Sequence, residues 1–88
     1  MISKEKRKKL HQILDLVIDI NNTKANAFFS FSGHVDDVKV DVLKNGWEIS
    51  NSPDLGELIF LGGEGKLNEC NALIRKLKTM KRELKENV

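Results

Sequence analysis

The sequence has few of the residues from which covalent cross-links, metal centres and catalytic sites are built. Its 88 residues include one cysteine, one proline, two histidines and no tyrosine. One cysteine excludes an internal disulfide, and a tetrahedral Cys/His metal site would lack ligands. Cys70 falls in an apolar helical stripe, where cysteine acts as a small hydrophobic residue. We therefore expect a protein that is not an enzyme and uses no metal or cofactor.

Long apolar runs are also absent. No segment approaches the roughly 18 consecutive apolar residues that a membrane-spanning helix needs. Asp15 and Asp19 interrupt the stretch that follows the basic N-terminus, which is not typical of a secretory leader. Together with the missing disulfide framework, these features predict a cytoplasmic protein without a membrane partner, folded as a single small domain over residues 1–88.

The small net charge hides a segregation along the chain. Fifteen Lys and Arg residues against 13 Asp and Glu residues give a formal charge of +2. Residues 1–11 carry five positive and one negative side chain, and residues 73–88 carry six positive and two negative, so each segment has a net charge of +4. Residues 12–72 carry four positive and ten negative side chains, a net charge of −6. The chain is basic at both ends and acidic in its middle.

Apolar residues recur with helical spacing near the two ends of the chain. The first stripe consists of Leu10, Ile13, Leu14, Val17 and Ile18. It predicts a helix that ends near residue 21, with Ser3 as its N-cap. The second stripe consists of Cys70, Leu73, Leu77, Met80 and Leu84. It predicts an amphipathic helix with a basic outer surface.

Between these helices the pattern alternates, as in β-strands. In a first predicted strand, one side carries Ala27, Phe29 and Phe31 and the other carries Phe28, Ser30 and Ser32. In a second, Val38, Val40 and Val42 form the core face. Asn45-Gly46 favours a two-residue type I′ hairpin, which would place Val42 opposite Ile49 and Trp47 on the core face. Residues 55–61 predict a further strand.

The predicted fold class is α+β, with the order α-β-β-β-β-α. The sheet has three or four antiparallel strands, depending on residues 55–61, and both helices pack on one face of it. The relative direction of the helices matters for function. Antiparallel helices would join the two basic ends of the chain, whereas parallel helices would separate them.

Two loops contain residues that also occur in functional motifs. His34, Asp36 and Asp37 offer metal-ligand chemistry, but adjacent aspartates are typical of a solvated turn. Residues 62–66 lie between a strand and a helix, as a phosphate-binding loop does. Their spacing does not match a Walker loop, however, and Glu64 would repel an anion. We interpret both segments as turns.

The basic ends are candidates for nucleic-acid binding. If they meet, their side chains would form a patch that contacts phosphate groups with salt-sensitive affinity. The candidate residues are Lys6, Arg7, Lys8, Lys9, Lys78, Lys81, Arg82 and Lys85. The alternative interpretation is that these residues keep the helices soluble and complement a helix dipole.

The acidic middle is a candidate for protein binding. Asp36, Asp37, Asp41 and Glu48 fall on loops and on the outer face of the predicted sheet. They are placed to meet a basic surface of a partner, although such residues are often simply the solvated side of an antiparallel sheet. Open sheet edges and a spare apolar strip formed by Phe28, Leu43 and Leu16 favour a second partner, another copy of the chain in a homodimer.

Two resemblances accompany these patterns. The segments 29–35, 40–42 and 45–47 resemble short uncharacterised proteins of phages and mobile elements in Gram-positive bacteria, which implies an accessory role in phage or plasmid biology. Gly33-His34 between two strands, and Lys66 before the last helix, are similar to the double-stranded-RNA-binding domain. That resemblance implies contacts from the first helix, this loop and the start of the last helix. The leading hypothesis remains a non-enzymatic accessory protein that binds a protein partner.

Overall fold

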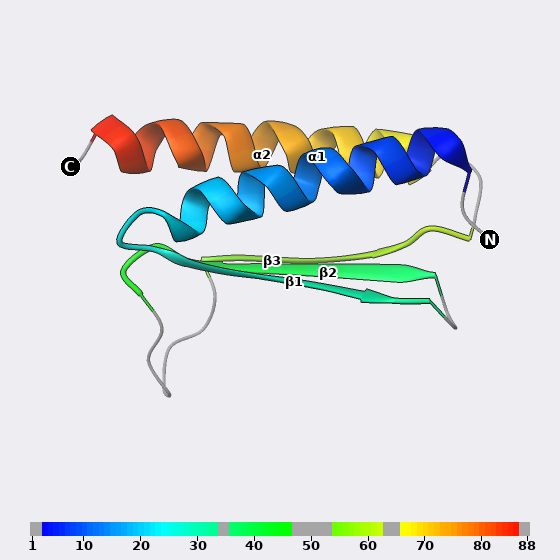
Figure 1. The fold of residues 1–88 in the computed structure, drawn as a ribbon, viewed down its shortest axis with the longest axis horizontal. Helices are drawn as coiled ribbons and strands as arrows, with labels where there is room; N and C mark the ends of the chain where they lie inside the picture. The colour runs from blue at the N-terminus through cyan, green and yellow to red at the C-terminus, as the bar shows by residue number, and fades with distance from the viewer. Residues whose placement is uncertain (1–2, 34–35, 47–53, 63–65, 87–88) are drawn as a thin grey trace.

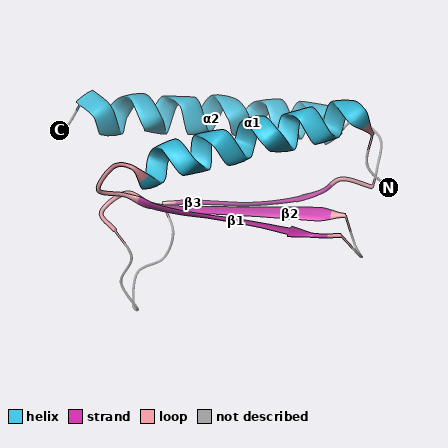
Figure 2. Cartoon of the chain, viewed as in Figure 1, coloured by secondary structure: helices cyan, strands magenta, loops and turns pink. Residues whose placement is uncertain are grey.

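Two helices cover one face of a three-stranded antiparallel sheet (Figures 1 and 2). The computed structural model describes residues 3–33, 36–46, 54–62 and 66–86, with side chains to residue 84. The elements are α1 (Lys4–Asn21), β1 (Asn26–Ser32), β2 (Asp37–Leu43), β3 (Leu55–Phe60) and α2 (Lys66–Glu86), and the strand order is β1-β2-β3. The predicted α+β class is confirmed, with three strands in the described part of the chain.

Helix α1 begins where the sequence predicts. The hydroxyl of Ser3 accepts a hydrogen bond from the backbone N–H of Lys6 at 3.2 Å and so caps the first turn. The apolar stripe differs from the prediction, however. Helix α1 buries Leu10, Ile13, Leu16, Val17 and Ile20, whereas Leu14 and Ile18 remain exposed. The stripe is rotated because α1 packs against α2 as well as against the sheet, which leaves the opposite flank of α1 uncovered.

The two helices run parallel, and the number of strands explains why. Three antiparallel strands between two helices require four chain reversals, so α2 points in the same direction as α1 (Figure 1). Lys81 near the end of α2 forms an ion pair with Asp19 near the end of α1, with 2.7 Å between Nζ and Oδ2. At the other end, Lys6 Nζ donates a hydrogen bond to the backbone carbonyl of Leu61, just before α2. A fourth strand would have reversed α2.

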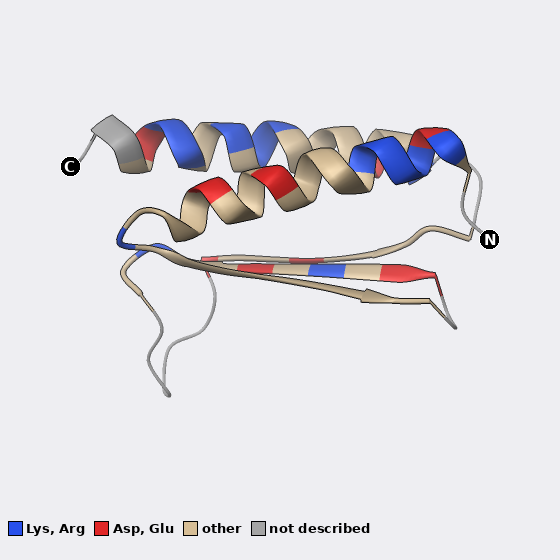
Figure 3. Ribbon diagram, viewed as in Figure 1, with Lys and Arg blue, Asp and Glu red and all other residues tan. Residues whose placement is uncertain are grey.

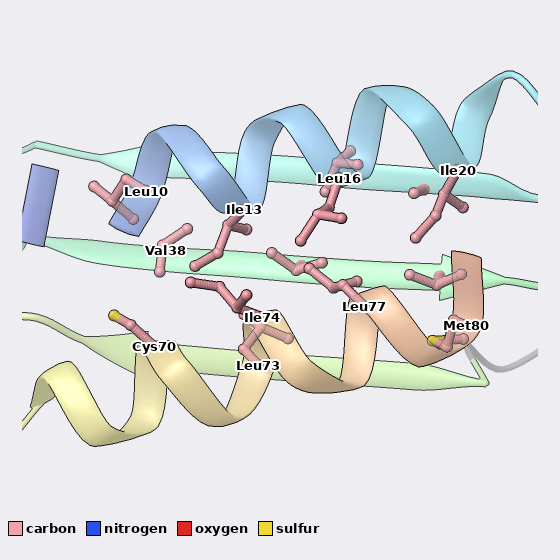
Figure 4. Close-up of a cluster of buried hydrophobic side chains, with 14 of the residues drawn as sticks. Leu10, Ile13, Leu16, Ile20, Val38, Cys70, Leu73, Ile74, Leu77 and Met80 are labelled. Atoms are coloured by element: carbon pink, nitrogen blue, oxygen red, sulfur yellow. The ribbon is translucent and has the colours of Figure 1, made fainter. Parts of the chain in front are cut away.

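The core lies between the helices and the sheet. The three alternating valines of β2, Val38, Val40 and Val42, are completely buried, as the period of two predicts. Ile13 of α1 and Leu77 of α2 are also completely buried, and both side chains lie in the layer above the central strand (Figure 4). Ile59 adds the contribution of β3. No polar or charged side chain is buried among the described residues.

The turn after β2 is displaced from the predicted one. The N–H of Gly46 donates to the carbonyl of Leu43 at 3.2 Å, so Lys44 and Asn45 occupy the middle of the turn. Gly46 has a φ of 90°, whereas Asn45 does not have a positive φ. The predicted type I′ turn, which needs positive φ at both Asn45 and Gly46, is therefore wrong.

The predicted strand partner of Val42 is also wrong. Val42 pairs with Ala27 of β1 on one side and with Leu55 of β3 on the other. A strand residue has only two neighbours in a sheet, so Val42 does not pair with Ile49. Trp47 and Ile49 themselves lie outside the described residues.

Candidate protein-binding edge at β1

Strand β1 forms an open edge of the sheet. Within the described part of the chain it pairs with β2 on one side only, and its sequence from Asn26 to Ser32 contains neither a charged residue nor a proline. Proteins usually protect such edges with charged side chains, proline or a bulge, because an exposed edge is a template for a further strand. The opposite edge strand, β3, carries Glu57, which is held by Lys76 of α2 at 2.6 Å. The edge of β1 lacks this kind of protection.

The side chain of Asn21 closes one end of this edge. Its Oδ1 accepts the N–H of Ala27 at 2.9 Å, and its Nδ2 donates to the carbonyl of Ala27 at 2.8 Å. The same Nδ2 lies 3.1 Å from the carbonyl of Val17, which fixes the amide to the last turn of α1. The amide thus makes the two hydrogen bonds that a neighbouring strand would make with Ala27.

These hydrogen bonds show which backbone groups of β1 face outward. The backbone N–H and C=O of Ala27 point to Asn21 and therefore away from β2. Val42, which lies opposite Ala27 in β2, points its backbone carbonyl away from β1, because that carbonyl accepts the N–H of Asp54 at 2.8 Å. Backbone direction alternates along an antiparallel strand. The N–H and C=O groups of Phe29 and Phe31 therefore point away from β2, along the open edge.

An apolar hollow of about 270 Å³ lies beside these two residues. Its lining comes from the first half of α1 and from β1, and consists of Arg7, Leu10, His11, Leu14, Phe29 and Phe31. Phe31 is 43% exposed and Leu14 is 39% exposed. Ile18 extends the uncovered apolar flank of α1 beyond the hollow. The rotation of the α1 stripe thus places apolar side chains next to unpaired backbone.

The predicted basic residues do not gather in one place. Because the helices are parallel, Lys6, Arg7, Lys8 and Lys9 lie at the opposite end of the molecule from the basic residues of the second half of α2 (Figure 3). In that second group, Lys81 is paired with Asp19. The side chain of Lys85 lies outside the described residues. The shared patch on which the nucleic-acid hypothesis depended is not formed.

The predicted acidic residues are dispersed as well. Asp37 and Asp41 are on the outer face of β2, but Lys39 lies between them, with its Nζ 3.7 Å from Asp41. Asp36 precedes β2 with a φ of 50°, and its carbonyl accepts the N–H of Leu61 at 2.7 Å. Glu48, like His34, lies outside the described residues. The outer face of β2 is therefore mixed in charge.

The outer face of the sheet carries a second exposed apolar group. Phe28, Leu58 and Phe60 are each about half exposed on the side away from the helices. Phe28 is thus available for contact, as predicted. Leu43 and Leu16 are not, because both belong to the buried residues of the protein, and their assignment to a spare strip is wrong.

The remaining chemistry of the described residues is limited. Cys70 is completely buried, and burial, assisted by the nearby Glu69 carboxylate, raises the pKa of its thiol. In the described ranges, no three His, Cys, Asp or Glu side chains gather in a way that could hold a metal ion. None of the helices, over the same ranges, is long and apolar enough to cross a membrane.

The most informative residues of this edge were not selected from the sequence. The Asn21-Asn22 pair predicts only a helix stop, although an asparagine that ends a helix a few residues before an edge strand is also within reach of that strand. Leu14 and Ile18 were assigned to the core.

Comparison with known proteins adds no relative, since no family model, curated protein or solved structure matches the chain.

Proposed function

We propose that this chain is a non-enzymatic protein-interaction module, which binds an extended segment of another protein at the open edge of β1. The observation that carries the proposal is the outward backbone of Phe29 and Phe31 beside an apolar hollow. Strand addition uses such an edge for main-chain hydrogen bonds and an adjacent pocket for side-chain specificity. A cytoplasmic accessory role in phage or mobile-element biology is part of the proposal, and rests on the resemblance of the sequence.

The binding free energy available at this edge fits a reversible interaction. Phe29 and Phe31 offer two donors and two acceptors, and each hydrogen bond contributes a net of about 0.5–1.5 kcal/mol. Covering the exposed parts of Leu14 and Phe31 adds the transfer of apolar surface from water, at about 25 cal/mol per Å². Part of this gain offsets the loss of motion on association. A partner of moderate affinity is expected.

Self-association through β1 is disfavoured by the position of α1. This helix lies above β1 along the sheet edge (Figure 4). Two copies joined by their β1 strands would bring their α1 helices to roughly the 4.8 Å strand spacing, whereas packed helices need about 8–10 Å. An extended peptide carries no helix above it and avoids this overlap.

A homodimer has a different surface available. The outer sheet face exposes Phe28, Leu58 and Phe60, and both described helices lie on the other face (Figure 1). Two such faces would pack as a sandwich, with side chains of both sheets in contact. Sedimentation velocity over the micromolar range tests this second candidate: a dimer that Phe60→Lys dissociates supports it, and a monomer at all concentrations excludes it.

The leading proposal is tested with a pair of matched variants. The immobilised full-length chain is incubated with extract of the organism that encodes it, and bound proteins are quantified. Phe31→Lys places a charge at the open edge, which opposes strand pairing. Phe60→Lys makes the same change on the outer face at a residue of similar exposure, and serves as the control.

We expect one stoichiometric partner that the wild type and Phe60→Lys retain and that Phe31→Lys loses by at least about ten-fold, or roughly 1.4 kcal/mol. Equal retention by both variants, or recovery of no partner, would contradict the proposal. Circular dichroism of each variant verifies that its fold is intact.

A further inference from the structure

The hollow beside β1 indicates which side chains of a partner would be recognised. A strand added opposite Phe29 and Phe31 would use alternate residues for its hydrogen bonds, and paired residues in adjacent antiparallel strands point to the same face. Phe29 and Phe31 point to the helix side of the sheet, because both line the hollow under α1. Two partner side chains, separated by one residue, would therefore point towards α1.

The size and lining of the hollow favour large apolar side chains. Four of its six lining residues are apolar, namely Leu10, Leu14, Phe29 and Phe31. Its volume of about 270 Å³ is below the roughly 300–1,000 Å³ of pockets that enclose drug-sized ligands. A hollow of this size and mostly apolar lining fits apolar side chains, with the polar side chains of Arg7 and His11 at its wall.

The charges along the uncovered flank of α1 are not uniform. Arg7 lines the hollow at the Phe31 end, and Lys4 and Lys8 are exposed within one turn of it. Asp15 is exposed beyond Leu14, at the other end. Figure 3 shows mostly basic residues in the first half of α1, with the acidic Glu5 in its first turn, and acidic residues in its second half. Complementary charges across an interface select the partner and its orientation.

From these observations we infer that the β1 edge binds an extended peptide segment with alternate large apolar residues and an acidic residue at the end that lies beside Arg7. The inference rests on the proposed function and names the chemical class of its partner. The closure of the Ala27 end by Asn21 confines the segment to Phe29 and Phe31, so the acidic residue is placed next to the apolar residue opposite Phe31.

The experiment uses a displayed library of random linear peptides and the immobilised full-length chain at about 50 mM salt, where charge pairs are little screened. The enriched sequences are expected to alternate apolar residues and to carry Asp or Glu on one side. A synthetic peptide of the enriched sequence is then titrated against variants. Arg7→Glu should weaken binding about five-fold, which corresponds to about 1 kcal/mol for an exposed ion pair.

Lys78→Glu is the matched control, because it makes the same charge reversal on an exposed residue of α2. It should leave the peptide affinity unchanged. Equal losses for Arg7→Glu and Lys78→Glu, or enriched peptides without an acidic preference, would overturn the inference. Displacement of the peptide by single-stranded DNA would also overturn it, since the Arg7 end would then recognise phosphate.

The failure of the inference and that of the proposed function give different results. If Phe31→Lys abolishes peptide binding while Arg7→Glu has no effect, the edge binds protein and only the acidic preference is wrong. If Phe31→Lys binds the peptide as tightly as the wild type does, the edge itself is not the binding site and both proposals are wrong.

Discussion

Replacement of Asn21 by alanine tests how the end of the β1 edge is built. The Asn21 side chain makes three hydrogen bonds, two with the backbone of Ala27 at 2.8 and 2.9 Å and one with the carbonyl of Val17 at 3.1 Å. Asn21→Ala removes all three. The backbone groups of Ala27 then depend on water, which reaches them only partly because this position is part-buried.

The expected loss of stability follows from these contacts. Three hydrogen bonds at a net of about 0.5–1.5 kcal/mol each are partly replaced by water and offset by the higher helix propensity of alanine, about 0.5 kcal/mol. We expect the free energy of unfolding to fall by about 1–3 kcal/mol. For a domain of this size, each kcal/mol lowers the melting temperature by about 4–8 °C.

Asn22→Ala is the matched control, because Asn22 is an exposed asparagine that donates its backbone N–H to the carbonyls of Asp19 and Ile20, which alanine can also do. Urea denaturation followed by circular dichroism gives both free energies. Asn22→Ala should change stability by less than about 0.5 kcal/mol. If the two substitutions have equal effects, the Asn21 amide does not replace a strand partner at Ala27, and the account of the closed end of the edge is wrong.

Three further predictions concern the turn, the helix ends and the core. Gly46→Ala should lower the free energy of unfolding by about 1 kcal/mol because Gly46 has a φ of 90°, whereas Asn45→Ala should have little effect. Equal losses of stability in urea denaturation would indicate that both residues need a positive φ, as in a type I′ turn. Lys81→Met should cost less than about 1 kcal/mol, since Asp19 and Lys81 are partly exposed, and the difference from wild type should shrink in about 1 M salt, where charges are screened; a salt-independent loss would contradict the ion pair. The raised pKa of the Cys70 thiol favours the protonated, folded state, so stability should decline as the pH rises above the ordinary thiol value of 9.0; the decline should be smaller in Cys70→Ala, and identical pH profiles would contradict it.

Local features of the fold could be predicted from the sequence. The Ser3 cap and the alternation of Val38, Val40 and Val42 each depend on neighbours within a few residues, and the structure confirms both. The predicted strand at 55–61 corresponds to β3, Leu55–Phe60. For the valines of β2, the period of two determines which side chains can be buried together.

Features that depend on the whole chain could not be predicted in the same way. Helix direction follows from the number of strands, and the sequence left three or four open. Leu14 and Ile18 have the spacing of core residues, yet α2 takes the other flank of α1 and leaves them exposed. The role of Asn21 depends on the return of the chain to Ala27. The candidate site was missed because all its parts arise from these tertiary contacts.

Amide hydrogen exchange of the isolated chain, measured residue by residue by NMR, shows directly whether the edge of β1 is open. An open edge predicts rapid exchange for Phe29 and Phe31, whose N–H groups face outward, and slow exchange for Phe28 and Ser30, which face β2. Ala27 should also be protected, by the Asn21 amide. If Phe29 and Phe31 are protected as strongly as Ser30, the edge is already occupied and does not serve as the binding site.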